Sequence, residues 1–350
     1  MNLQQRERRL GFKLMAPAFI VLMIVALYPL GHVFYTSMTD RVFAGREAPQ
    51  FIGLENYRRL LGVTLEELPP VIDEETGEQK IDEQTGEPVY ERPIRVLPRE
   101  PDLHRELTQF SLFGNRYVIG AITPSFLMAV WNTLYFTVVS VFLETVLGLI
   151  IALVVNSNFK GRGVMRATML VPWAVITVVS ARMWEWMFHS SRMGLFNTVL
   201  DYLNVIDEPI AFLTISELQI PSLIAVDVWK TTPFMALLIL AGLQMIPREL
   251  YEAARVDGAG KIRQFFTITL PLIKPSLAVA LVFRTLDALR VFDVFHVMLA
   301  RSRYSMASMN YYELVGNRNM GLSSAIGVII FIIIFAFAVV YMKMLGVEQQ

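Results

Sequence analysis

The stretch Glu252–Pro271 reads EAARVDGAGKIRQFFTITLP and is a short polar interruption between two long apolar runs. Its first four residues place two small alanines between charged Glu252 and Arg255, so a partner surface could approach the backbone closely. Asp257-Gly258 is a helix-ending signal, because glycine tolerates the left-handed conformation that closes a helix. A second amphipathic run follows from Lys261 to Leu270. The stretch predicts a helix–turn–helix on the membrane face that is available to a soluble partner.

The same residues carry a resemblance to a known family. Glu252-Ala253-Ala254, then Gly258, then Leu270-Pro271 have the spacing of the EAA loop of ABC importer permeases, and residues 257–260 and 268–272 are similar to the carbohydrate-uptake, maltose-permease-like branch of type I importers. The resemblance implies a coupling helix that seats in a groove of a separate ATPase subunit; the alternative is an ordinary interfacial helix. The residues expected to couple are Glu252, Ala253, Ala254, Arg255, Asp257, Gly258, Leu270 and Pro271.

Composition places the chain among membrane proteins. Hydrophobic residues make up 54% of it, and the mean hydropathy is +0.48. The net charge is zero, so the chain as a whole lacks the excess positive charge that is typical of nucleic-acid-binding proteins. It contains no cysteine, which excludes disulfides, thiolate metal sites and cysteine catalysis. The four histidines are scattered without metal-ligand spacing. We therefore expect no catalytic residue, metal or cofactor in this chain; the resemblance implies that ATP and Mg bind to the partner ATPase.

Several apolar runs reach the roughly 20 residues that a bilayer span needs. Prolines 17, 29, 172 and 233 lie within or near span ends and predict kinks or local unwinding. The fold class is therefore an all-α polytopic membrane protein with six transmembrane helices. The spans are expected at about Leu14–Tyr35, Phe126–Val155, Ala167–Phe188, Ser222–Met245, Ser276–Met298 and Ser323–Leu345.

Basic residues predict the orientation. They precede the first span, separate the second from the third, and surround the EAA loop, and all three segments lie on one side if there are six spans. By the positive-inside tendency that side is cytoplasmic. We expect a multi-pass protein of the bacterial cytoplasmic (inner) membrane, with both termini and the coupling loop in the cytoplasm.

The domain division follows from these spans. Residues 1–36 form a cytoplasmic tail and the first helix, residues 37–125 a periplasmic insertion, and residues 126–350 a permease core with five helices and the EAA loop at 246–275.

A tandem repeat marks the insertion, in which IDEETGE at 72–78 recurs as IDEQTGE at 81–87. Each copy places a polar turn between β-compatible ends, which predicts a three-strand antiparallel meander near Val71, Gln79–Ile81 and Val89–Tyr90. The alternative is a disordered acidic loop. As a folded module it would help to receive a binding protein.

The fifth span is unusual because it contains Arg284, Asp287, Arg290 and Asp293 at three-residue steps. Charges in hydrocarbon are costly, so these side chains should face the bundle interior and pair as Arg284–Asp287 and Arg290–Asp293. In sugar permeases the corresponding helix contributes to the substrate cavity, which makes these four residues candidates for the substrate path. The alternative is that they form structural ion pairs.

The fourth span adds Asp227, Trp229, Lys230 and Thr231. Sugars are commonly held by aromatic faces and hydrogen bonds, so Trp229 and Thr231 are candidate substrate contacts. The alternative is that Trp229 lies at the membrane interface and Lys230 extends to it.

The sequence thus resembles the larger permease subunit of an ATP-driven, binding-protein-dependent sugar importer. The resemblance implies a heterodimer with a second permease, two ATPase subunits and an extracytoplasmic sugar-binding protein, with membrane lipid around the spans and no nucleic acid. The alternatives are a permease for another solute such as a glycerophosphate, a secondary carrier with an ion site at Asp287 and Asp293, and a membrane-anchored receptor scaffold. The last two leave the EAA spacing unexplained.

Overall fold

The computed structural model describes residues 3–73, 77–82 and 86–344. They fall into two compact units, which we describe separately. The first unit comprises Met1–Leu127 and Asn310–Ile329, and the second comprises Met128–Met309 and Ile330–Gln350. The helices α5 (Pro124–Asn156), α14 (Met306–Tyr311) and α15 (Met320–Met344) pass from one unit into the other.

The first unit holds the N-terminal helix and the insertion. Its elements are α1 (Leu3–Leu22), the π-helix η1 (Met23–Leu27), α2 (Tyr28–Thr36), α3 (Glu55–Leu61), β1 (Val63–Leu68), α4 (Pro93–Val96), β2 (Arg105–Leu112), β3 (Asn115–Ala121) and the π-helix η4 (Tyr312–Gly316). The predicted unwinding near Pro29 is confirmed, because η1 immediately precedes the turn in which Pro29 lies.

A three-stranded antiparallel sheet in the order β1-β3-β2 occupies the insertion. Leu68, Leu97 and Val118 form a small core beneath it. The predicted segments near Val71, Gln79–Ile81 and Val89–Tyr90 do bond to one another, because the Val71 amide donates to the Val89 carbonyl, the Lys80 amide to the Val71 carbonyl and the Val89 amide to the Lys80 carbonyl. They were wrong as strands, since they form isolated bridges rather than a ladder. They offer too few apolar side chains to extend a ladder, whereas β3 pairs on both edges and buries Val118 completely. The turns at 74–76 and 83–85 lie outside the described residues.

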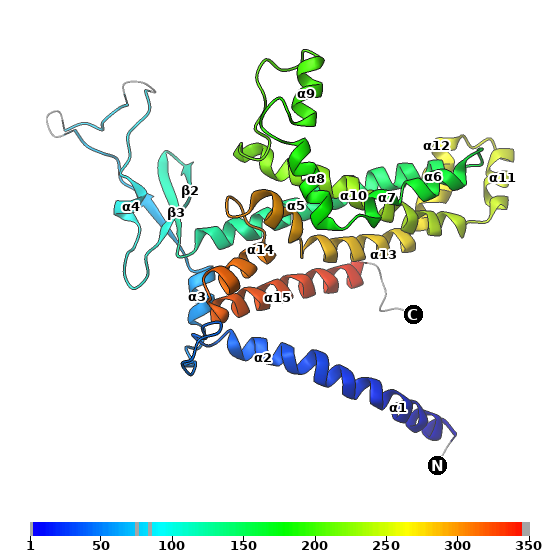
Figure 1. The fold of residues 1–350 in the computed structure, drawn as a ribbon, viewed down its shortest axis with the longest axis horizontal. Helices are drawn as coiled ribbons and strands as arrows, with labels where there is room; N and C mark the ends of the chain where they lie inside the picture. The colour runs from blue at the N-terminus through cyan, green and yellow to red at the C-terminus, as the bar shows by residue number, and fades with distance from the viewer. Residues whose placement is uncertain (1–2, 74–76, 83–85, 345–350) are drawn as a thin grey trace. The chain divides into compact units, whose positions relative to one another are not determined.

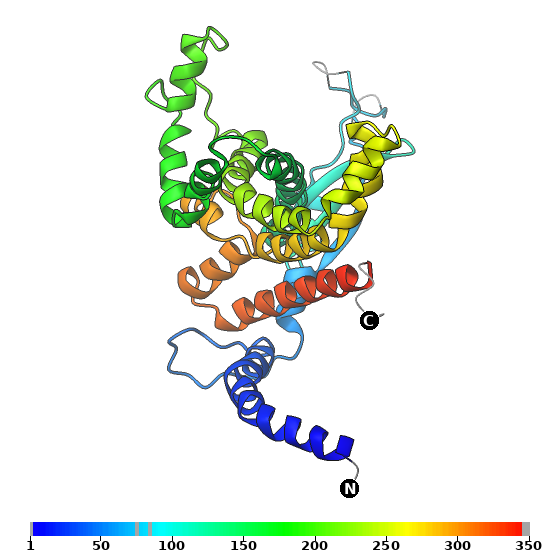
Figure 2. The same cartoon turned by 90° about the vertical axis from the view of Figure 1, so that its right-hand side faces the viewer.

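The second unit is a helical bundle (Figure 1). Besides most of α5, it contains α6 (Arg162–Thr168), α7 (Val171–Ala174), α8 (Thr177–Met187), α9 (Leu195–Tyr202), α10 (Ser216–Gln244), α11 (Arg248–Val256), α12 (Lys261–Gln264), the π-helix η2 (Phe265–Thr269), α13 (Leu270–Ala288) and the π-helix η3 (Phe295–Leu299). Figure 2 shows α9 beyond the end of α8, and the Phe196 ring of α9 stacks on the Trp184 ring of α8 with 5.6 Å between their centroids.

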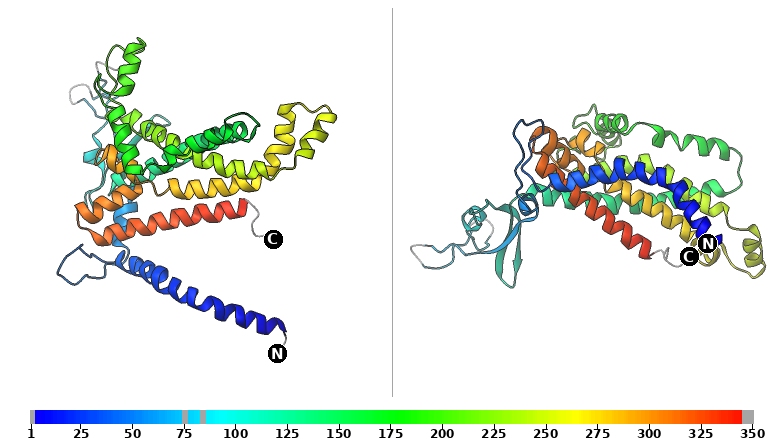
Figure 3. Two further views of the ribbon diagram at one scale, coloured as in Figure 1. Left: turned by 45° about the vertical axis from the view of Figure 1, so that its right-hand side comes forward. Right: turned by 90° about the horizontal axis from the view of Figure 1, so that it is seen from below.

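Helices α10 and α13 pack closely along each other (Figure 1). A Cβ on Gly242 of α10 would come within 2.6 Å of the Ser276 Cβ of α13, so glycine permits this approach. Met235, Ile239 and Ile273 are fully buried in the core between these helices. The α11–α12 hairpin lies at the end of this pair, as the left panel of Figure 3 shows.

The described residues contain five helices long and apolar enough to cross a membrane, or six if one bent pair counts as a single span. The bent pair is Arg162–Ala174 with Thr177–Met187, which meet at 88°. This break falls just after Pro172 and confirms the irregularity predicted there. Large apolar side chains such as Ile24, Phe142 and Phe335 are exposed on these helices, as a lipid-facing surface requires.

The predicted bounds of the fifth span, Ser276–Met298, were wrong. The apolar helical segment runs from Lys261 to Ala288. Pro271 lies in the first turn of α13, where a missing backbone N–H breaks no hydrogen bond of that helix, so the chain stays helical through it. Backbone bonds between residues three apart then close the helix, from the Arg290 and Val291 amides to the carbonyls of Asp287 and Ala288.

Candidate functional site

The helix–turn–helix predicted around Asp257-Gly258 is confirmed. Helix α11 ends at Val256, and Gly258 adopts φ = +77°. The amide of Ala259 donates to the Ala254 carbonyl at 2.8 Å, and the amide of Gly258 donates to the Arg255 carbonyl at 3.1 Å. These two bonds are those of a Schellman motif, which requires a left-handed residue at the position of Gly258.

Helix α11 presents an open surface. None of its residues is buried, and Glu252, Ala253 and Arg255 are exposed. The apolar Val256 is 88% exposed, and Ile262 at the start of α12 is 78% exposed. Large apolar side chains exposed beside a polar helix face indicate a surface for a protein partner.

The hairpin is joined firmly to the bundle on its other side. The Tyr251 hydroxyl and Thr269 Oγ1 are hydrogen-bonded at 2.8 Å, which links α11 to η2. Tyr251, Ile268 and Leu270 also pack against the buried core between α10 and α13. A force on the exposed face of α11 therefore reaches these two long helices through packed side chains.

A buried ion cluster joins α5, α10 and α13 within the second unit. Arg284 Nε donates to Glu144 Oε2 at 2.5 Å, and Arg284 Nη2 donates to Glu144 Oε1 at 3.0 Å and also to Asp227. The predicted Arg284–Asp287 pair is confirmed, with 2.9 Å between Nη1 and Oδ2. Arg284 and Glu144 are almost inaccessible, with side chains 4% and 0% exposed. One guanidinium thus holds three carboxylates from three helices.

Thr231 extends this cluster. Its hydroxyl is 2.6 Å from Glu144 Oε1 and 2.6 Å from the Asp227 carbonyl. Glu144 was missed by the sequence reasoning, although a single carboxylate within the apolar run of α5 carries the same signal that identified Arg284.

A cavity of about 230 Å³ opens beside the ion cluster. Of the six predicted path residues, Trp229 does not line it. The lining side chains that carry charge or a hydroxyl are Thr177, Asp227, Lys230, Thr231, Arg284, Asp287, Arg290 and Asp293.

The expected Arg290–Asp293 pair was wrong. Both residues follow the end of α13, so they are not spaced on one helix, and Arg290 Nε donates instead to the Leu286 carbonyl at 3.2 Å. Within the described part of the chain no ion pair joins Arg290 and Asp293.

Trp229 and Lys230 have other partners. Trp229 packs edge-on against Trp184 at 5.6 Å between ring centroids, in an aromatic cluster that includes Phe188 and Phe196. Lys230 Nζ donates to the carbonyls of Trp173 and Val175 at 3.2 and 2.5 Å. These carbonyls lie at the break between α7 and α8, so Lys230 satisfies backbone groups that the break leaves free.

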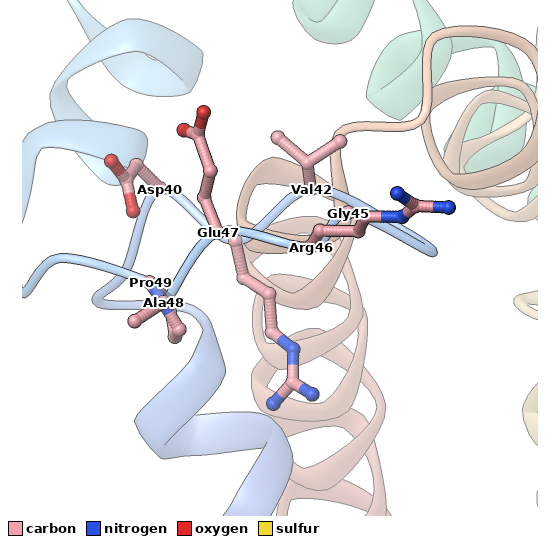
Figure 4. Close-up of a pocket in the computed structure, with 8 residues that line it drawn as sticks. Asp40, Val42, Gly45, Arg46, Glu47, Ala48 and Pro49 are labelled. Atoms are coloured by element: carbon pink, nitrogen blue, oxygen red, sulfur yellow. The ribbon is translucent and has the colours of Figure 1, made fainter.

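The first unit has a separate hollow of about 290 Å³, formed by the loop at 40–49. The loop is held by a bridge between Val42 and Asn319, and the Phe43 amide donates to the Arg318 carbonyl at 2.7 Å. Figure 4 shows the Glu47 and Arg46 side chains extending in different directions. The loop brings no set of polar groups together at one centre, so it carries no candidate site.

The described residues contain no cluster of three or more histidine, cysteine or acidic side chains that could hold a metal ion.

Comparisons with known proteins find relatives both by sequence and by structure. The family model "Binding-protein-dependent transport system inner membrane component" matches residues 144–346. The trehalose/maltose transport system permease protein MalF of Thermococcus litoralis is 37% identical over 98% of this chain and 95% of its own length. The trehalose transport system permease protein SugA of Mycobacterium tuberculosis is 34% identical over 97% of this chain and 90% of its own length.

A solved bacterial ABC transporter involved in the import of the acidic polysaccharide alginate has the same fold. Its TM-score is 0.68 over 99% of this chain and 98% of that chain, at 19% identity. The resemblance found in the EAA loop is thereby confirmed over the whole length of the chain. The chain belongs to the binding-protein-dependent transport system inner membrane components, as a multi-pass permease of the ABC importers of the carbohydrate-uptake branch.

Proposed function

We propose that this chain forms the solute path of an ATP-driven sugar importer together with a second, different permease. Two separate ATPase subunits bind ATP and Mg and dock on the cytoplasmic side, and an extracytoplasmic binding protein delivers the sugar. Relatives named for trehalose and maltose support the substrate class.

The observation that carries the coupling role is the exposed α11 hairpin anchored on the α10–α13 pair. Glu252, Ala253 and Arg255 form the face for the ATPase, and the Gly258 turn fixes the angle at which the chain enters α12. Closure of the ATPase dimer moves α11, and the Tyr251–Thr269 bond and Leu270 transmit that movement to α13. This is coupling between distant sites through a rigid, packed element.

The cavity beside Arg284 is the proposed substrate path. Thr231, Asp287, Arg290 and Asp293 line it and supply hydroxyl, carboxylate and guanidinium groups for hydrogen bonds to sugar hydroxyls. The buried Glu144–Arg284 pair holds α5 and α13 together and sets the width of the cavity. Trp229 lies in the aromatic cluster and does not line the cavity, so it is not part of the proposed path.

The experiment is transport by the reconstituted assembly. The permease is co-expressed with its second permease and its ATPase, purified and placed in liposomes with the binding protein, trehalose and internal ATP. We expect ATP-dependent trehalose uptake and co-purification of the ATPase, both lost on replacing Glu252 with Lys. Uptake that persists without any ATPase would contradict the proposal. Uptake of glycerol phosphate in place of sugar would contradict the substrate class alone.

A further inference from the structure

A second cavity of about 710 Å³ lies where α5 and α10 end and α6 and α11 begin. Its walls come from four elements of the second unit. The lining residues are Asn156, Ser157, Asn158, Arg162, Arg166, Leu243, Gln244, Ile246, Arg248, Tyr251, Glu252 and Arg255. Glu252 and Arg255 also belong to the proposed ATPase face, but the proposed coupling function gives no role to the lining residues from α5, α6 and α10.

Positive charge dominates the cavity. Four arginines line it against a single carboxylate, that of Glu252. Within the described residues none of the four forms an ion pair. Arg162 donates to the Asn158 side chain at 3.1 Å, Arg255 to the Tyr251 carbonyl at 3.3 Å, and Arg248 makes no hydrogen bond. Four guanidiniums around one cavity with a single carboxylate among them favour an anion there.

Arg166 adds a separate observation. Its Nη2 donates to the Val155 carbonyl at 3.1 Å, which fixes the guanidinium against the end of α5. Its Nε is buried and has no hydrogen-bond partner among the described residues. An N–H that is removed from water and left unpaired is costly, so such a group calls for an acceptor that the protein itself does not supply.

The position of the cavity relative to the ends of the membrane spans indicates the source of the anion. It lies level with the ends of two helices that are long and apolar enough to span the bilayer, Pro124–Asn156 and Ser216–Gln244. Span ends are where phosphate headgroups lie, and basic pockets between spans on the cytoplasmic side bind anionic lipid headgroups. The amides of Asn156, Asn158 and Gln244 can bond to hydroxyls around a phosphate.

We propose that this cavity binds the phosphate and polar headgroup of an anionic phospholipid. The proposal rests on the proposed cytoplasmic placement of α11, because only that orientation sets the cavity at the inner headgroup layer. A headgroup held here contacts both the α5–α6 connection and α11, so it adjusts the position of the coupling hairpin from its inner side.

Native mass spectrometry of the purified permease–ATPase assembly tests this. The assembly is exchanged into mixed micelles with phosphatidylglycerol or phosphatidylcholine, and lipid adducts are counted. We expect retention of phosphatidylglycerol over phosphatidylcholine. The Arg162→Gln/Arg166→Gln variant should lower that retention roughly 25-fold, since each basic side chain near an anionic lipid contributes about a fivefold preference. The ATPase should still co-purify.

Matched variants distinguish an effect of charge on lipid binding from an effect of misfolding. Lys261→Gln/Arg263→Gln removes the same charge from exposed positions on α12 outside the cavity and should retain the lipid. Arg248→Gln removes a guanidinium without internal hydrogen bonds, so it should lower lipid retention without loss of the fold.

Three outcomes overturn the proposal. One is equal phosphatidylglycerol retention by the wild type and the Arg162/Arg166 variant. Another is loss of the lipid adducts when inorganic phosphate is added, together with equal stabilisation of the assembly by phosphate alone, which makes the ligand a soluble anion. The third is loss of the ATPase with the lipid retained, which makes the arginines a docking surface for the ATPase. Trehalose uptake and the side at which α11 lies are measured in separate experiments, so failure of the lipid proposal and failure of the proposed function are distinguishable.

Discussion

Arg284 is the residue on which the proposed transport path depends most. It is the only cation that contacts Glu144 and Asp227 among the described residues, and it joins three helices. Removing one partner of a buried ion pair leaves an uncompensated charge, which costs about 3–5 kcal/mol. Arg284→Gln should therefore lower the thermal unfolding temperature of the purified permease sharply.

The matched control is Arg290→Gln, six positions along the chain from Arg284. Arg290 is exposed and bonds only to a backbone carbonyl, so its loss should leave the unfolding temperature within experimental error while changing sugar uptake. Equal destabilisation by both variants would show that the ion cluster is not what holds the three helices.

Gly258 gives a second prediction at this scale. Its φ of +77° costs an ordinary L-residue about 1–2 kcal/mol. Gly258→Val should weaken ATPase co-purification and uncouple ATP hydrolysis from transport, and Gly258→Asn should be milder because asparagine tolerates this conformation. Gly260→Val is the control, since Gly260 has a negative φ and open space around it. Similar loss in both variants would assign the effect to bulk rather than to the turn.

The contacts of Gly258 and Arg284 differ in how far they could be predicted from the sequence. The Gly258 turn was predictable because a Schellman motif depends on a few consecutive residues. The Arg284–Asp287 pair was predictable for the same reason, as an i, i+3 contact. The Glu144–Arg284 pair spans 140 positions, and nothing local in the sequence joins them. Only the packing of α5 on α13 brings the two together.

Among the elements, the α10–α13 pair is the part that must stay rigid if α11 acts as a lever. Gly242→Ala adds a methyl group where Ser276 already stands 2.6 Å away, and overpacking of this kind costs about 1–3 kcal/mol. We expect lower stability and less transport per ATP hydrolysed. Gly31→Ala, which meets no atom within 4 Å, is the control in stability and uptake measurements. An unchanged ratio of transport to hydrolysis would argue against transmission through this contact.

Residues 72–88, the arm of the insertion that carries the tandem repeat, allow another test. The sheet core of Leu68, Leu97 and Val118 lies outside residues 72–88, so replacing that range with a Gly-Ser linker should leave the sheet folded. If the arm helps to receive the binding protein, stimulation of ATP hydrolysis by the binding protein should fall relative to the unstimulated rate. The same stimulation in the deleted form would remove the arm from that interaction.

Element ends were predictable where apolar runs give way to polar residues, as at the C-terminal ends of α5 and α10. The predicted start of α10 was wrong, because the helix begins at Ser216, six residues before the predicted Ser222. Element ends were not predictable at Pro271, because proline breaks a helix interior and yet fits a first helical turn, and the sequence alone does not say which applies. The strands β1, β2 and β3 escaped notice since their apolar residues do not alternate strictly with polar ones; β1, for example, reads VTLEEL, although its burial alternates in the structure.

For the molecule as a whole, orientation in the membrane is the property that the proposed function most needs. The chain has no cysteine, so single cysteines can be introduced without background. Cysteine at Arg255 should react with an impermeant maleimide only after the membrane is opened. Cysteine at Phe113, which is 98% exposed in the turn between β2 and β3, should react in intact cells. Labelling of both from outside would overturn the coupling role.

The role of Lys230 has a wider consequence for what the permease can admit. Lys230 donates to two carbonyls of the broken span and Arg284 is bound by carboxylates, so both cations are held in place. Arg290 keeps spare donors, because only its Nε bonds to a backbone carbonyl and its side chain is exposed at the cavity. The carboxylates of Asp287 and Asp293 line the same cavity. A polyhydroxyl solute in the proposed path can therefore donate protons to fixed anions and accept them from a fixed cation, which suits a molecule whose every hydroxyl does both.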